Sequence, residues 1–201
     1  MEPYFQTTPF TCAASSLLII LHHLNPEIEL NRENEFDIWQ KTTNLPTRGS
    51  SIYALANYAK KLGLNLQIIV EKKEYEFPDY RFYRYTKEDI EHAAFSSELH
   101  KKQAEENKII IKEKKIVIED IKKELMSNNI LLLRINAKPI RNTKRNTSNY
   151  IVVHGYSESS FQIIDPALGA LSISEEIMKE SFESLETKKY RDHRMIVFKE
   201  S

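Results

Sequence analysis

The sequence contains one cysteine, four glycines and no excess of either charge among its 201 residues. A single cysteine cannot form a disulfide within the chain, and the first residues lack the basic and apolar regions of a signal peptide. We therefore expect a cytoplasmic protein. The 29 basic and 29 acidic residues balance, which argues against a dedicated nucleic-acid or membrane-surface binder. No apolar run approaches the roughly 20 residues of a membrane-spanning helix.

The composition that remains is typical of a globular chain. Hydrophobic residues make up 41% and charged residues 29% of it, which is enough apolar material for one core. We expect a single domain over 1–201, with a helical lobe at about 1–62, a variable middle at about 63–128 and a sheet lobe at about 129–201. The sequence has no Cys/His pair at ligand spacing and no phosphate-cradling glycine pattern, so we expect no metal and no cofactor.

Hydrophobic periodicity separates a helical first part from a strand-rich last part. Apolar residues at helical spacing predict helices at about 12–24, 32–42 and 51–62. Later segments are predicted as strands at 64–70, 109–111, 116–118, 130–135, 150–153, 161–164 and 194–198, and as helices at about 86–106, 119–128 and 174–185. Helices followed by an antiparallel sheet indicate an α+β fold.

The sole cysteine, Cys12, stands at the start of the first predicted helix. Unpaired backbone N–H groups and the positive end of the helix dipole favour a thiolate there. A free cysteine is also among the most often buried residues, so its position alone leaves a plain core role open. A nucleophilic cysteine needs a base, a group that orients this base, and oxyanion donors. Gln6 can donate an amide N–H beside it, and the last hairpin carries His154 and Asp165.

Several stretches together resemble a known family. They read PYFQTTPFTC at the start, EFDIWQKTT further on, and YIVVHGY and IDP in the last third. They resemble the C39-like cysteine peptidases of the papain-like superfamily, in particular the branch found beside ATP-grasp ligases and acetyltransferases. The resemblance implies a papain-like α+β fold, with N-terminal helices packed on a C-terminal antiparallel sheet. It implies hydrolysis of a peptide or isopeptide bond through an acyl-enzyme, with Cys12 as nucleophile, Gln6 as oxyanion donor and Asp165 as orienting residue.

One position departs from the family pattern. The general-base histidine of these peptidases immediately precedes the aromatic-Val-Val-Val strand, and Asn149 stands there in this chain. An asparagine cannot accept the thiol proton. His154 lies five residues further on, and the alternation of side chains along a strand places it on the face opposite Asn149. Three explanations stay open: His154 acts as base through a β-bulge next to Gly155, the cleft binds without catalysis, or Asn149 is an introduced substitution.

The expected partner is a peptide or protein. The basic stretch 138–145 could recognise an acidic tail, although solvated loop charge is the simpler account. The aromatic stretch 75–85 is predicted to line a groove or to pack as a loop. Three functions remain: a cysteine peptidase, a non-catalytic peptide-binding module, or an amide or acyl-transfer enzyme that uses the same nucleophile. The sequence does not indicate an oligomeric state.

Overall fold

The computed structural model describes residues 1–74, 85–186 and 191–199. Its N-terminal part forms three helices, α1 (Cys12–Leu24), α2 (Arg32–Thr42) and α3 (Ile52–Lys61). Local sequence sets their ends. The side chain of Asn31 accepts the backbone N–H of Asn34 and caps α2, and Gly63 takes a positive φ of 86° just after α3, as expected of a glycine that terminates a helix.

Seven strands of the described chain form one sheet in the order β2-β1-β7-β3-β4-β5-β6. In chain order they are β1 (Leu66–Val70), β2 (Ile110–Glu113), β3 (Asn129–Asn136), β4 (Ser148–Ser157), β5 (Ser160–Asp165), β6 (Gly169–Ser174) and β7 (Arg194–Lys199). The pair β1 and β2 is parallel, and the other neighbouring pairs are antiparallel.

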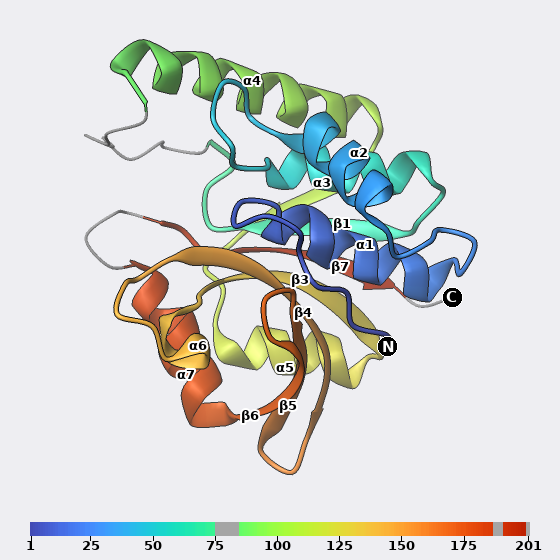
Figure 1. Ribbon diagram of the computed structural model, residues 1–201, viewed down its shortest axis with the longest axis vertical. Coiled ribbons are helices and arrows are strands. Elements are labelled where there is room, and N and C mark those ends of the chain that lie inside the picture. Colours follow the sequence, from blue (N-terminus) through green and yellow to red (C-terminus); the bar gives the residue numbers. More distant parts are fainter. Residues whose placement is uncertain (75–84, 187–190, 200–201) are drawn as a thin grey trace.

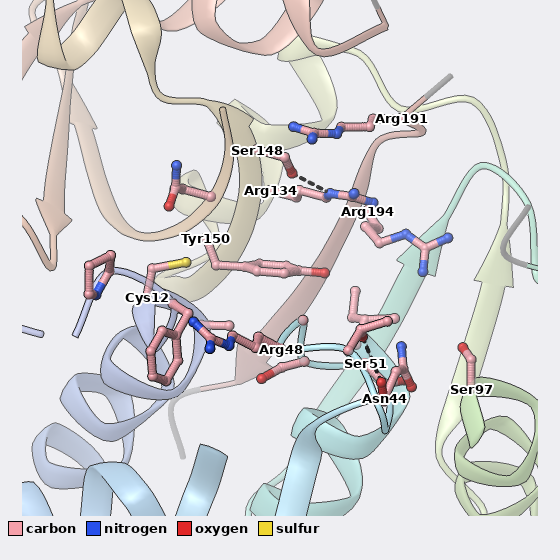
Figure 2. Close-up of a pocket in the computed structure, with 18 of the residues that line it drawn as sticks. Cys12, Asn44, Arg48, Ser51, Ser97, Arg134, Ser148, Tyr150, Arg191 and Arg194 are labelled. Atoms are coloured by element: carbon pink, nitrogen blue, oxygen red, sulfur yellow. Dashed lines mark hydrogen bonds between the residues drawn. The ribbon is translucent and has the colours of Figure 1, made fainter. Parts of the chain in front are cut away.

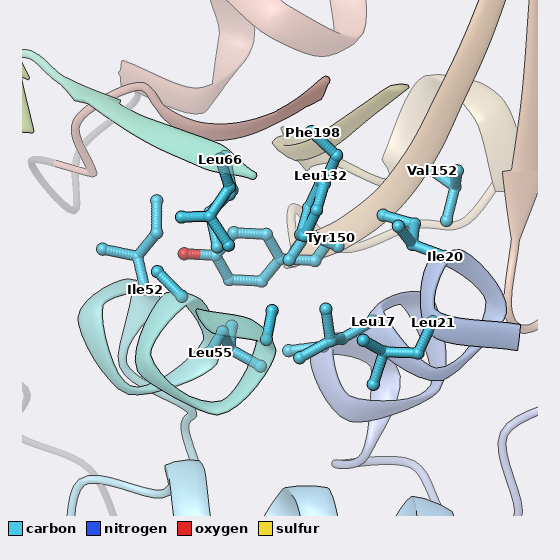
Figure 3. Close-up of a cluster of buried hydrophobic side chains, with 14 of the residues drawn as sticks. Leu17, Ile20, Leu21, Ile52, Leu55, Leu66, Leu132, Tyr150, Val152 and Phe198 are labelled. Carbon is cyan, nitrogen blue, oxygen red and sulfur yellow. The ribbon is translucent and has the colours of Figure 1, made fainter. Parts of the chain in front are cut away.

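Helices cover both faces of the sheet (Figure 1). One face packs against α1 and α3, and α4 (Lys87–Glu106) lies against α3. The other face carries α5 (Ile118–Met126), the short α6 (Lys138–Arg141), α7 (Glu175–Glu183) and a 3-10 turn (Ser184–Glu186). Side chains along β4 alternate between the two faces of the sheet and so contribute to two hydrophobic cores. Tyr150 and Val152 pack toward α1, whereas Ile151 and Val153 pack on the opposite side. Figure 3 shows the first of these cores between the helices and the sheet.

The pairing of α1 with β4 positions the functional side chains. The Ser16 hydroxyl, one turn into α1, donates a buried hydrogen bond of 2.9 Å to the backbone carbonyl of Tyr150. This contact holds the first turn of the helix beside the first residues of the strand. Cys12 and Asn149 are therefore brought together, although 137 positions separate them in the sequence.

The predicted α+β arrangement of helices packed on a sheet is confirmed, with some local differences. Residues 169–174 form the strand β6, which was not predicted. The expected strand at 116–118 instead leads into α5, and the basic stretch that begins at residue 138 includes the short helix α6. Most of the aromatic stretch 75–85 lies outside the described residues. Within the described ranges, no helix combines the length and the apolar character that crossing a bilayer requires.

Candidate functional site

Cys12 lines a cavity of about 350 Å³ between the helical part and the sheet (Figure 2). Its walls come from the start of α1, the loop between α2 and α3, α4, and the strands β3, β4 and β7. Segments that are distant in the sequence thus meet around one thiol.

Cys12 is the first residue of α1 and is partly exposed. Burial nevertheless raises the pKa of its thiol above the ordinary value. The backbone N–H of Tyr150 and the positive charge of Arg141 act in the opposite direction without reversing the shift. The position at the start of a helix was expected to lower the pKa of the thiol. In the structure, the loss of water around the sulfur raises this pKa by more than the other effects lower it. At neutral pH the residue is mainly a protonated thiol.

A buried carboxylate, Glu35, holds the segment that leads into Cys12. It accepts the backbone N–H of Thr7 at 2.9 Å, the hydroxyl of Ser15 at 2.9 Å and the hydroxyl of Tyr4 at 3.0 Å, and the Thr11 hydroxyl donates to it as well. Burial of Glu35 raises its pKa, but these hydrogen bonds outweigh burial and lower the pKa below the usual value. The Thr11 side chain consequently does not cap α1.

Asn149 stands beside Cys12 in the cavity wall. It is 8% exposed, and its side-chain nitrogen donates to the hydroxyl of Thr147 at 3.2 Å. The resemblance places a general-base histidine at this position. A carboxamide has no nitrogen that accepts a proton near neutral pH, so the thiol has no base on this wall.

Asp165, the residue expected to orient the base, is fully buried at the end of β5. Arg141 of α6 donates to both of its oxygens, through Nε at 2.8 Å and Nη2 at 2.7 Å. The backbone N–H of Ala167 adds a third bond at 2.8 Å. Both carboxylate oxygens of Asp165 are thus hydrogen-bonded to an arginine. Sequence reasoning missed Arg141 as its partner, although buried carboxylates are often paired with a cation and residues 138–145 are rich in cations.

His154 lies at a β-bulge, because the pairing of β4 with β5 shifts between Val153 and Gly155. The bulge does not bring the imidazole to Cys12. His154 lines a separate cavity of about 270 Å³ together with Met1 and His23. The five residues from Asn149 span about 16 Å along a strand, which carries His154 toward the far end of α1. All six histidines lie in the described ranges, and none lines the Cys12 cavity.

Gln6, the expected oxyanion donor, is tied to its own segment. Its side-chain N–H donates to the carbonyl of Thr8 at 2.8 Å, and its backbone N–H donates to the carbonyl of Pro166 at 2.9 Å. The side-chain oxygen is buried without a partner in the described structure. Gln6 therefore joins the first segment to the residues after Asp165, and one of its two side-chain N–H groups is already engaged by Thr8.

The cleft is strongly basic. Among the described lining residues of the Cys12 cavity are four arginines and no carboxylate: Arg48, Arg134, Arg191 and Arg194. An adjoining cavity of about 640 Å³ shares Asn149 and Arg191 and adds Arg141 and Arg145. Arginines gathered in a concave, partly dry surface attract anions and bind carboxylates with paired hydrogen bonds. Their positions are scattered through the sequence, so no local pattern predicted the cluster.

Comparison with known proteins identifies the fold family. The sequence profile of the Peptidase_C39 like family matches residues 1–196. The chain belongs to this C39-like peptidase family. No curated protein matches the sequence. The predicted resemblance is thereby confirmed at the level of family and fold.

Three solved structures share the fold of this C39-like chain. A double glycine motif protease from an AMS/PCAT transporter, solved with the leader peptide, is 16% identical (TM-score 0.50) over 100% of this chain and 93% of its own. The peptidase domain of Streptococcus ComA is 12% identical (TM-score 0.50), over 99% and 98%. A C39-like peptidase from Bacillus anthracis is 12% identical (TM-score 0.52), over 100% and 95%. At these identities the likeness concerns the fold alone.

Proposed function

We propose that this C39-like protein binds a peptide in the Cys12 cleft and does not hydrolyse it by a cysteine–histidine mechanism. The observation that carries the proposal is the pairing of Asp165 with Arg141, next to a cysteine whose neighbour is Asn149. Asn149 does not accept a proton at neutral pH, and Arg141 already engages the carboxylate that would orient a histidine.

The chemistry of acyl transfer supports this proposal. A thiol with a raised pKa needs a base within hydrogen-bond reach before it can attack a carbonyl. Asn149 cannot serve as that base, and His154 lies in another cavity. Asp165 cannot be redirected to a histidine without breaking its pair with Arg141, and separating a buried ion pair typically costs about 3–5 kcal/mol. In this chain Asp165 anchors α6 to the end of β5.

The shape and lining of the cleft support a peptide as the ligand. The cavity combines aromatic surface from Phe10 and Tyr85 with hydroxyl, amide and guanidinium groups, a mixture suited to a polar chain with side chains of several kinds. The guanidinium of Arg48 lies 4.8 Å from the centre of the Phe10 ring. A protease of the same fold was solved with a leader peptide, which supports peptide binding by this architecture.

A second candidate is hydrolysis of a peptide or isopeptide bond by Cys12, as the resemblance implies. The partial exposure of Cys12 and the backbone N–H of Tyr150 that faces its sulfur favour this candidate. The cysteine would then attack without a histidine in the cavity, supported by the charge of Arg141. Acyl transfer or another amide reaction would require the same nucleophile, Cys12, and the same oxyanion donors.

Alkylation of Cys12 separates the two candidates. We expect iodoacetamide to react slowly at pH 7, with an apparent pKa above the ordinary thiol value of about 8.5. A mixed tetrapeptide library should slow the reaction further by occupying the cleft. The Asn149→His variant supplies the missing base and should alkylate faster at pH 7. Rapid alkylation of the wild-type protein, together with cleavage of the library that disappears in Cys12→Ala, would instead establish the peptidase.

A further inference from the structure

Arg48 differs from the other arginines that line the Cys12 cavity. It lies in the loop between α2 and α3, and Figure 2 shows it at the same end of the cavity as Cys12. Arg134 and Arg194 contact the carboxylate of Asp192. The side chain of Arg48 is exposed and makes no hydrogen bond or ion pair with the residues that the structure describes. Its guanidinium donors are therefore open to a ligand.

Three contacts nevertheless hold Arg48 in place. Its backbone N–H donates to the hydroxyl of Tyr85 at 3.1 Å, and its carbonyl accepts the indole N–H of Trp39 at 3.2 Å. Its guanidinium stacks over the ring of Phe10 at 4.8 Å from the ring centre, a cation–π contact. A long side chain loses conformational freedom when it binds a ligand. Because Arg48 is already held in the free protein, this entropic cost of binding is reduced.

The ring beneath Arg48 also connects it to the thiol. Phe10 lies two residues before Cys12, and its ring centre is 5.0 Å from that of Trp39. Phe10 and Tyr85 both line the cavity, so apolar ring surface borders the guanidinium. Water is partly excluded beside such surface, and an ion pair is stronger there than in open solvent. A carboxylate bound by Arg48 would therefore lie close to the part of a peptide that contacts Cys12.

We propose that Arg48 selects peptides that carry a carboxylate next to the residue held at Cys12. The planar guanidinium matches the two oxygens of a carboxylate with paired hydrogen bonds. Among the described residues that line the cavity, no carboxylate competes for it. The inference rests on the proposed peptide binding and adds the group that decides which peptides bind.

The single tryptophan provides a readout of binding, since Trp39 donates to the carbonyl of Arg48 and lies against Phe10. Its fluorescence is titrated in the full chain with three N-acetylated peptides. Two are amidated, Ala-Ala-Glu-Ala-Ala and Ala-Ala-Gln-Ala-Ala, and the third is Ala-Ala-Gln-Ala-Ala with a free C-terminus. At low salt we expect a charged peptide to bind about fivefold more tightly than the uncharged one. The charged peptide that shows this preference distinguishes a side-chain carboxylate from a C-terminal one.

The Arg48→Met variant removes the charge and keeps an apolar stem over Phe10. The preference for the charged peptide should fall to less than about twofold, while the affinity for the uncharged peptide stays the same. Arg32→Met is the matched control. Arg32 is also an exposed arginine over a phenylalanine ring, 5.2 Å from the centre of Phe36, but it is not among the described residues that line the cavity. This variant should keep the preference.

The outcomes separate the role of Arg48 from peptide binding itself. Equal binding of charged and uncharged peptides to the wild-type protein, or a preference that persists in Arg48→Met, would overturn the selection by Arg48 and leave peptide binding intact. If no peptide changed the fluorescence of Trp39 or slowed the alkylation of Cys12, the proposed peptide binding would be overturned as well.

Discussion

Replacement of Arg141 by methionine should destabilise the protein strongly, because the pair between Arg141 and Asp165 is buried. Asp165 is inaccessible to solvent, and the side chain of Arg141 is only 15% exposed. Without the guanidinium, the only remaining hydrogen-bond donor to the Asp165 carboxylate in the described structure is the backbone N–H of Ala167. Removing one partner of such a pair costs about 3–5 kcal/mol, a large share of the 5–15 kcal/mol by which domains are typically stable.

The free energy of unfolding in urea measures this effect, provided that unfolding is two-state. Asp165→Asn should cost a similar amount, since it leaves the arginine without its anion. The double variant Arg141→Met/Asp165→Asn should lose much less than the sum of the single losses, because neither change then leaves an unpaired charge. Arg145→Met changes an exposed residue of the same basic stretch and should stay within about 0.5 kcal/mol of the wild type.

A different result would refute the structural role of this pair. If Arg141→Met and Asp165→Asn each cost less than about 1 kcal/mol, or if their effects were simply additive, Asp165 would be available to another partner. The claim that Arg141 is the structural partner of this carboxylate would then fail.

Three further predictions concern residues around the cleft. Because the pKa of Glu35 is lowered in the folded protein, its ionised carboxylate stabilises the fold above about pH 4.3, the usual glutamate pKa. This contribution to the free energy of unfolding is lost as the pH falls through the folded pKa. Glu35→Gln should therefore flatten acid unfolding and cost about 1–3 kcal/mol at pH 7 in urea titrations. Asn149→His should give cleavage of a fluorogenic peptide that Cys12→Ala abolishes; no cleavage by a folded variant would show that more than the base is missing. Ser16→Ala removes the bond to Tyr150 and should cost about 1 kcal/mol by urea unfolding, with Ser127→Ala as an exposed control.

The helices could be predicted because their signals are local. The apolar run after Cys12 and the capping side chain of Asn31 set the observed starts of α1 and α2. The strand β6 escaped prediction because residues 169–174 are short and mix small and polar side chains with few apolar ones. Its pairing with β5, rather than its own composition, makes it a strand.

The candidate site could be predicted only in part. Cys12 and Asn149, which the motifs singled out, line the same cavity, but the pattern alone does not say how far along α1 a given strand residue lies. The bulge at His154 was one of the anticipated possibilities, yet the residue faces a different cavity. The partner of Asp165 was missed because Arg141 lies 24 positions earlier and reaches it through α6. Such contacts depend on the tertiary arrangement.

The central claim is that the wild-type protein does not hydrolyse peptides. The most direct test is mass spectrometry of a peptide library after incubation with the wild-type protein, with Cys12→Ala or with Asn149→His. We predict intact peptides and an unmodified Cys12 in the wild-type sample, and cleaved peptides only in the Asn149→His sample. Cleavage or an acylated cysteine in the wild-type sample, absent from Cys12→Ala, would contradict the proposal that this cleft binds peptides without cutting them.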